Sequence, residues 1–166
     1  LHANDTSTAI TRLAEMEVPP YLIGSSIVGV MAQRLVRKVC SKCSSIVQVD
    51  PIKDKLAFEY GIKEIAKANI IKIDNKNDPS SSLKDEKTCP VCNGSGFKGR
   101  LGLYEVMRVN DNIRELIMKS SNADEIKECA MKNGMRTLLN YGLELVEQQL
   151  TSLEEVERVC LLEESE

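Results

Sequence analysis

Aromatic residues are scarce in this chain of 166 residues: they make up 4% of it, and tryptophan is absent. A core must therefore be built from aliphatic side chains, which suits packed helices. The hydrophobic fraction of 42% is large enough for a folded core, and the length allows one ordinary domain or two small ones. We expect a mainly helical fold.

The sequence also lacks a long apolar run and a strong charge of one sign. Its longest apolar stretch, residues 21–32, is interrupted by Gly and Ser and is shorter than the roughly 20 residues of a membrane span. The net charge of −3 is unfavourable for broad binding to nucleic acid. We therefore expect no direct membrane insertion and no nucleic-acid partner. The first residues also lack the pattern of a signal peptide.

One local basic strip remains, formed by Arg34, Arg37 and Lys38. Such a strip is typical of a solvated strand face, and it is also compatible with a subunit interface or a place near phosphate. The sequence leaves both interpretations open.

Helical periodicity predicts a first helix over residues 8–16, with capping oxygens at Asn4, Asp5 and Thr6. A second, buried helix is expected over residues 21–31, and a strand or an extended segment over 32–40. Residues 51–71 have an amphipathic helical pattern, in which Gly61 marks a break. The polar residues 72–88 read as a solvent-exposed loop.

The last third of the chain begins with one bent strand or a strand pair over residues 97–109. Four amphipathic helices are predicted after it, at about 112–119, 123–134, 136–150 and 151–162. Asn122 or Ser121 is expected to cap the second of these, and Thr151 and Glu154 have the spacing of a capping box at the start of the last.

Four of the six cysteines form two CxxC pairs, CSKC with Cys40 and Cys43 and CPVC with Cys89 and Cys92. Each CxxC places two sulfurs on one tight turn, and two such turns supply the four thiolates of a tetrahedral zinc site. The 45 residues between Cys43 and Cys89 are more than a simple zinc ribbon contains. The four cysteines therefore match the ligand chemistry of zinc better than they match the zinc-ribbon fold.

Two other interpretations of the pairs stay open. A redox dithiol needs only one CxxC, which leaves the second pair unexplained, and the four residues could also be ordinary cysteines. We favour zinc, in a structural role, because four protein ligands leave no position for a substrate water. Cys129 and Cys160 lie among apolar residues of expected helices and are interpreted as small buried hydrophobes. This usage of cysteine favours a reducing cytoplasm.

The motifs, taken in order, resemble the C-terminal part of the type II secretion and type IV pilus assembly ATPases. The resemblance covers almost the whole chain and rests on LHAND, TRL-x-x-M, AQRLVRKVCSKC, CPVCNGSGFKGRLGLYEVM, NGMRTL and TSLEEVERV. It implies an α/β fragment, mainly α: the end of a RecA-like ATPase core over residues 1–39, a tetracysteine zinc-binding subdomain over 40–97, and a strand with a C-terminal helical subdomain over 98–166.

The same resemblance implies the role of the parent protein. Such a parent is a homo-hexamer that binds ATP and Mg and acts on an inner-membrane platform protein, in the cytoplasm at the inner membrane. LHAND matches the histidine box, so His2 would lie near the γ-phosphate, and Arg100 would lie beside the nucleotide base. Retraction ATPases generally lack the tetracysteine module, so the cysteines favour assembly or secretion.

The chain also departs from the family pattern. No GxxxxGK[ST] segment occurs in it, and no acidic strand end precedes His2, so we expect that this chain alone does not hydrolyse ATP. LHAND has Ala3 where the family often has Thr. The alternative function is a free-standing, zinc-stabilised protein-interaction module.

Overall fold

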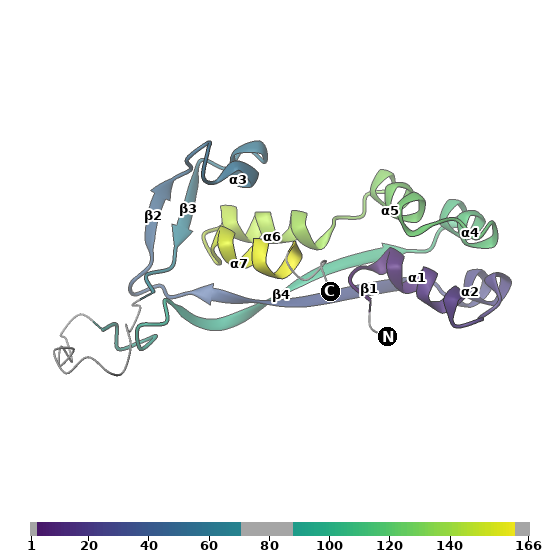
Figure 1. The fold of residues 1–166 in the computed structure, drawn as a ribbon, viewed down its shortest axis with the longest axis horizontal. Coiled ribbons are helices and arrows are strands. Elements are labelled where there is room, and N and C mark those ends of the chain that lie inside the picture. The colour runs from purple at the N-terminus through teal and green to yellow at the C-terminus, as the bar shows by residue number, and fades with distance from the viewer. Residues whose placement is uncertain (1–2, 71–87, 162–166) are drawn as a thin grey trace. The chain divides into compact units, whose positions relative to one another are not determined.

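The computed structural model describes residues 3–70 and 88–161. The chain has a small α/β fold in which helices predominate, as expected (Figure 1). Its described helices are α1 Thr6–Glu15, α2 Pro20–Ser26, α3 Lys55–Glu59, α4 Asp111–Met118, α5 Ala123–Lys132, α6 Leu138–Glu147 and α7 Leu153–Cys160. The described strands are β1 Gly29–Val39, β2 Ser45–Gln48, β3 Glu64–Lys67 and β4 Phe97–Arg108.

The chain divides into two compact units, each formed by separate stretches of sequence. The first contains the chain up to Leu35, Gly102–Gly142 and the segment from Arg158, and the second contains Val36–Leu101 and Leu143–Glu157. Strands β1 and β4 pair in a two-stranded sheet and contribute residues to both units. The division into residues 1–39, 40–97 and 98–166 was expected from the family resemblance. It stays a prediction.

The core of the first unit is aliphatic, as the scarcity of aromatic residues requires. Helices α1 and α2 lie beside α4 and α5 (Figure 1), and each helix contributes isoleucine. The i, i+4 spacing of Ile113 and Ile117 puts both on the inner face of α4. The buried members of this core are Ile10, Ile23, Met107, Val109, Ile113, Ile117, Ile126 and Ala130.

The first unit also contains a buried carboxylate, that of Glu105 on β4. Side chains alternate along this strand, so Leu103 and Met107 are buried while Tyr104 and Val106 are exposed. Glu105 falls on the buried face and accepts hydrogen bonds from Thr6 N (2.9 Å), Thr6 Oγ1 (2.6 Å) and Leu138 N (3.2 Å). The carboxylate therefore joins the start of α1 and the start of α6 to β4.

The second unit contains a short antiparallel hairpin of β2 and β3, with α3 between the two strands in sequence. Its register pairs Ser45 with Lys67 and Gln48 with Glu64. Ala66 of β3 packs in a small core with Val39 and Phe97, from the ends of β1 and β4 that belong to this unit. Val39 directly precedes Cys40, and Phe97 follows Cys92 by five residues, so this core is close in sequence to both CxxC pairs.

Two of the expected helices were wrong in extent. The helix expected over residues 21–31 ends at Ser26, and β1 begins at Gly29. Pairing with β4 decides this, since Val109 N donates to the carbonyl of Val28 at 3.0 Å. The expectation that this helix is buried was wrong in part, because Ile23 and Gly24 are buried but Tyr21 is 59% exposed.

The amphipathic helix expected over residues 51–71 is mostly absent. Only α3 is helical there, and Gly61 adopts a left-handed φ of +83° that ends it. Residues 64–67 form β3 because β2 supplies hydrogen-bonding partners, and β2 itself was not foreseen. The predicted loop at 72–88 lies, apart from Thr88, outside the described residues.

The strand and helices of the last third are confirmed, with β4 as one strand followed by α4, α5, α6 and α7. Asp5 and Asn122 cap α1 and α5 through their side chains. The capping box of Thr151 and Glu154 was wrong: Thr151 Oγ1 donates to the carbonyl of Arg37, and Ser152 Oγ accepts from the N–H of Glu155. Glu154 instead pairs with Lys67 at 3.1 Å.

The helices were also compared with the requirements of a bilayer. Within residues 3–70 and 88–161, none combines the length and the apolar composition that a membrane crossing demands.

The buried carboxylate of the first unit gives a stability prediction. Glu105→Met keeps the side-chain length but leaves three donors without their acceptor, so we expect the free energy of unfolding to fall by about 3 kcal/mol. Urea unfolding followed by circular dichroism measures this loss. Val106→Met, on the exposed face of the same strand, is the control and should change stability by less than about 0.5 kcal/mol. Equal effects of the two substitutions would contradict the assigned role of Glu105.

Candidate functional site

The two CxxC pairs lie together in the second unit. The sulfur atoms of Cys40, Cys43, Cys89 and Cys92 all lie within 4.8 Å of one another. Cys40 Sγ is 3.8 Å from Cys89 Sγ, and Cys43 Sγ is 3.6 Å from Cys92 Sγ. Cys40 and Cys92 are buried, and Cys43 and Cys89 are half-buried. Each turn thus contributes one enclosed and one more accessible sulfur.

The first CxxC follows the end of β1 directly. Cys40 N donates to the carbonyl of Gly96 at 2.9 Å, which ties this pair to the segment that carries the second pair. Ser44 N and Cys43 N both donate to the carbonyl of Cys40, at 2.9 and 3.3 Å. These bonds close the tight turn that brings the sulfurs of Cys40 and Cys43 to one side.

The second CxxC is closed by a similar turn and a serine. Asn93 N donates to the carbonyl of Cys89 at 2.8 Å, and Ser95 Oγ donates to the carbonyl of Cys92 at 2.6 Å. Gly96 has a left-handed φ of +74°, and a Cβ there would lie 3.0 Å from the carbonyl oxygen of Asn69. Glycine is therefore required both for the conformation and for the close approach of the two chain segments.

The thiols influence one another electrostatically. Burial and hydrogen bonds with the neighbouring sulfurs raise the pKa of the Cys43 thiol to about 12. Burial acts against ionisation of Cys92 as well, but donation from Gly96 N and from the thiol of Cys43 lowers the pKa of Cys92 to about 6. Of these two thiols, Cys92 therefore ionises at a lower pH than Cys43.

This donor set fits a metal ion. Four thiolates at such separations repel one another unless a cation lies between them. Four sulfurs from two tight turns also match the ligand number and type of a tetrahedral structural site. Among the residues that the structure describes, these cysteines are the only group of metal-ligating side chains arranged in this way. They could hold one metal ion.

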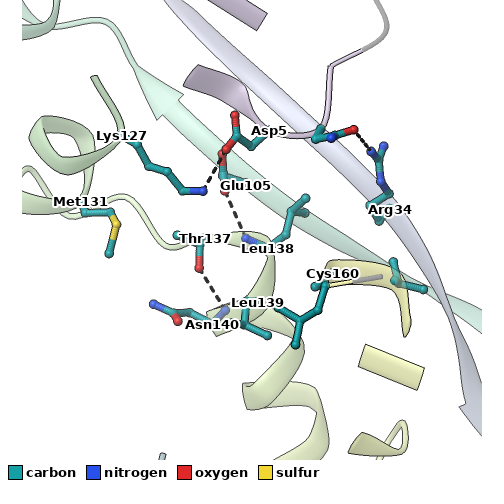
Figure 2. Close-up of a pocket in the computed structure, with 13 residues that line it drawn as sticks. Asp5, Arg34, Glu105, Lys127, Met131, Thr137, Leu138, Leu139, Asn140 and Cys160 are labelled. Carbon is teal, nitrogen blue, oxygen red and sulfur yellow. Dashed lines mark hydrogen bonds and ion pairs between the residues drawn. The ribbon is translucent and has the colours of Figure 1, made fainter. Parts of the chain in front are cut away.

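The first unit contains a cavity of about 380 Å³ with charged and apolar walls. Figure 2 shows Lys127 directed towards Asp5, and Glu105 directed towards the backbone N–H of Leu138 at the start of α6. The lining residues are Asn4, Asp5, Arg34, Glu105, Lys127, Met131, Thr137, Leu138, Leu139, Asn140, Val159, Cys160 and Leu161.

The carboxylate of Asp5, which lines this cavity, has a shifted pKa. Partial burial opposes its ionisation, but hydrogen bonds from Thr8 N at 2.8 Å and Lys127 Nζ at 2.9 Å stabilise the carboxylate. Together they lower the pKa of Asp5 to about 2. The ion pair with Lys127 also joins the first residue before α1 to α5.

The nucleotide-proximal residues expected from the sequence are not brought together by the described structure. His2 lies outside the described residues. Arg100 lies on β4 in the second unit and is exposed. Both roles stay predictions. Cys129 and Cys160, expected to be small buried hydrophobes, are each half-buried.

The basic strip has two different environments. Arg34 is half-buried and lines the cavity of the first unit. Lys38 is exposed, and Arg37, in the second unit, forms an ion pair with the buried Glu155 at 2.7 Å. Arg37 is therefore not simply part of a solvated strand face.

Three buried carboxylates among the described residues, those of Asp54, Glu105 and Glu155, were missed at the sequence level. Glu105 lies between the buried Leu103 and Met107 on a strand with alternating side chains. This alternation in the sequence indicated that Glu105 faces inward. Glu155 lies on α7, where its neighbours Val156 and Val159 are buried. For Glu155 the helical periodicity indicated burial, but nothing in the sequence indicated Arg37 as its partner.

Comparison with known proteins shows that the sequence of this chain matches one family. The family model described as "Type II/IV secretion system protein" matches residues 1–158. The chain is 40% identical over 156 residues to the type IV pilus assembly ATPase PilB of Thermus thermophilus. It is 36% identical over 160 residues to the type II secretion system protein E of Pectobacterium carotovorum, and 36% identical over 159 residues to the type II secretion system ATPase E of Vibrio cholerae.

These matches cover nearly all of this chain but a small part of its relatives. They include 94% of the chain for the Thermus protein and 96% for the other two. The matched region is 16% of the Thermus protein and 28% of each of the others. The chain therefore corresponds to one portion of much longer relatives.

The Asp5–Lys127 pair gives a pH prediction. Because the pKa of Asp5 falls from 3.8 to about 2 on folding, its ionised form stabilises the fold by about 2 kcal/mol above pH 5. That contribution should be lost as the pH falls from 3.8 to 2. Asp5→Asn keeps a capping side chain but not the charge. The difference in unfolding free energy between the wild-type chain and Asp5→Asn should therefore be about 2 kcal/mol at pH 6 and close to zero at pH 2.

Urea unfolding at the two pH values measures this difference. Asp124→Asn, at an exposed position on α5, serves as the control, for which we expect a small and nearly constant difference. A difference for Asp5→Asn that does not change with pH would contradict the assigned carboxylate–ammonium interaction.

Proposed function

Because this chain belongs to the type II/IV secretion system protein family, we propose that it is the C-terminal part of a hexameric ATPase motor that powers type IV pilus assembly or type II protein secretion. The observation that carries the proposal is the cluster of four cysteine sulfurs within 4.8 Å, in a chain matched over residues 1–158 by this family. The resemblance assigns such a tetracysteine module to the assembly and secretion branches, and relatives from both branches match the chain.

The metal of the proposed site is zinc. Zinc prefers tetrahedral thiolate ligands, and four protein ligands leave no open position for catalysis, so its role is structural. The ion would neutralise the mutual repulsion of Cys40, Cys43, Cys89 and Cys92 and join the end of β1 to the segment before β4. Such a site contributes on the order of 10 kcal/mol to folding.

The nucleotide chemistry belongs to the parent protein in this proposal. Residues 1–39 form the end of a RecA-like core, His2 lies near the γ-phosphate of ATP, and Arg100 lies beside the base. ATP and Mg are held mainly by parts of the parent outside this chain, since the sequence contains no GxxxxGK[ST] segment. The parent acts in the cytoplasm at the inner membrane, on a platform protein embedded there.

The motor proposal is tested by the coding sequence upstream of Leu1. We expect it to encode a GxxxxGK[ST] segment, and the full product to hydrolyse ATP, whereas the 166-residue chain alone should show only background hydrolysis in a phosphate-release assay. Replacement of the lysine of that segment by alanine is the control that should abolish activity. A gene that encodes no such segment upstream of Leu1 would instead favour the alternative function, a free-standing, zinc-stabilised interaction module.

The zinc proposal is tested by the metal content of the purified chain. We expect about one equivalent of zinc, which Cys43→Ser should largely abolish because one of four ligands is lost. Cys129→Ser, outside the cluster, is the matched control and should keep the metal. Less than half an equivalent of zinc in the wild-type chain, together with rapid alkylation of Cys40 and Cys89 under native conditions, would contradict the proposal.

A further inference from the structure

The end of β1 in the second unit is held by a network around Arg37, which we call the Arg37 cluster: Arg37, Phe97, Thr151 and Glu155. The Glu155 carboxylate accepts from Arg37 N at 3.0 Å, Arg37 Nε at 3.0 Å and Arg37 Nη2 at 2.7 Å. Thr151 Oγ1 donates to the carbonyl of Arg37 at 2.8 Å. Arg37 is thus held through its backbone N–H, its carbonyl and its side chain.

The strength of this network follows from its geometry and burial. Two guanidinium nitrogens donate to the two oxygens of one carboxylate, which is the bidentate pairing that fixes orientation best. The Glu155 side chain is 1% exposed, so water competes little for it. The guanidinium also lies over the ring of Phe97, 4.1 Å from its centroid, which adds a cation–π interaction.

The cluster reaches both halves of the cysteine site. Arg37 lies on β1 three residues before Cys40, and between them Val39 N donates to the carbonyl of Leu150 at 3.0 Å. On the other side, Ser95 Oγ donates to the carbonyl of Cys92 at 2.6 Å and lies 3.0 Å from the carbonyl oxygen of Phe97. The segment that carries the first CxxC is therefore attached directly to residues 150–155, and the segment that carries the second is attached to them through the contact of Phe97 with Arg37.

We propose that Glu155 is a positioning residue for the metal site: through Arg37 and Phe97 it holds the two CxxC segments in a geometry that binds the metal. This inference rests on the proposed zinc site and goes beyond its ligands. Without the cluster, ordering of the two segments must be achieved by the metal itself, and that entropic cost weakens binding. Binding and cluster formation are then thermodynamically linked, so each stabilises the other.

The linkage is tested by release of zinc from the full 166-residue chain to a chromophoric chelator. Removal of a residue that orients metal ligands typically weakens metal binding by 10- to 100-fold; we expect Glu155→Gln to bind one equivalent and release it about tenfold faster than the wild-type chain. Glu154→Gln is the matched control, because it lies on the same helix and loses only an exposed pair with Lys67. Its release rate should stay within about twofold of the wild-type rate.

Two further measurements protect the test against a variant that fails to fold. Arg37→Lys keeps the charge but loses the bidentate geometry and the stacking on Phe97, and it should release zinc about threefold faster or more. In the wild-type chain, removal of zinc should speed hydrogen exchange of the Arg37 and Val39 amides about tenfold, because their acceptors belong to residues 150–155.

The outcomes separate this inference from the zinc proposal. A wild-type chain that binds no zinc overturns the zinc site, and with it this role for Glu155. A wild-type chain with one equivalent of zinc, whose Arg37 and Val39 amides exchange at the same rate with and without metal, overturns the positioning role alone. Release at the wild-type rate from folded Glu155→Gln or Arg37→Lys does the same.

Discussion

The convergence of four cysteine sulfurs is the constraint on which the local geometry of the site in the second unit depends. Sulfur atoms within 4.8 Å of one another cannot all ionise unless a cation lies between them. The opposite pKa shifts of Cys43 and Cys92 express that conflict within the protein alone. The surrounding features, from the left-handed Gly96 to the hydrogen bond between Cys40 N and the Gly96 carbonyl, keep the sulfurs close. The structural metal proposed for this site would remove the repulsion between the thiolates and make the arrangement stabilising.

Each unit also contains a buried carboxylate that accepts several hydrogen bonds. Glu105 binds Thr6 and the N–H of Leu138 in the first unit, and Glu155 binds Arg37 in the second. Burying such groups is costly unless their hydrogen bonds are complete. Because each one receives donors from segments far apart in sequence, it specifies the relative placement of those segments within its own unit. Aliphatic packing alone, in a chain so poor in aromatic residues, is less directional.

Membership of the type II/IV secretion system protein family gives these features a functional setting. The family match extends over residues 1–158, although the chain spans only 16% to 28% of the three relatives described above. The tetracysteine module is complete within this span, and it is the part whose chemistry the described residues can support on their own. The nucleotide site is different, because the proposed role of His2 depends on groups that other parts of a longer protein supply.

The sequence by itself determined the local features. The CxxC turns, the four C-terminal helices and the caps at Asp5 and Asn122 follow from spacing and side-chain chemistry within a few residues. The family motifs likewise are local strings. Tertiary structure alone decided that residues 64–67 become a strand, because β2 must be present to pair with them. It further decided that Ser152, rather than Thr151, accepts a hydrogen bond from the first turn of α7. It also decided the partners of Glu105 and Glu155, because those contacts join residues 33 to 118 positions apart, a separation at which spacing carries no information about distance in space.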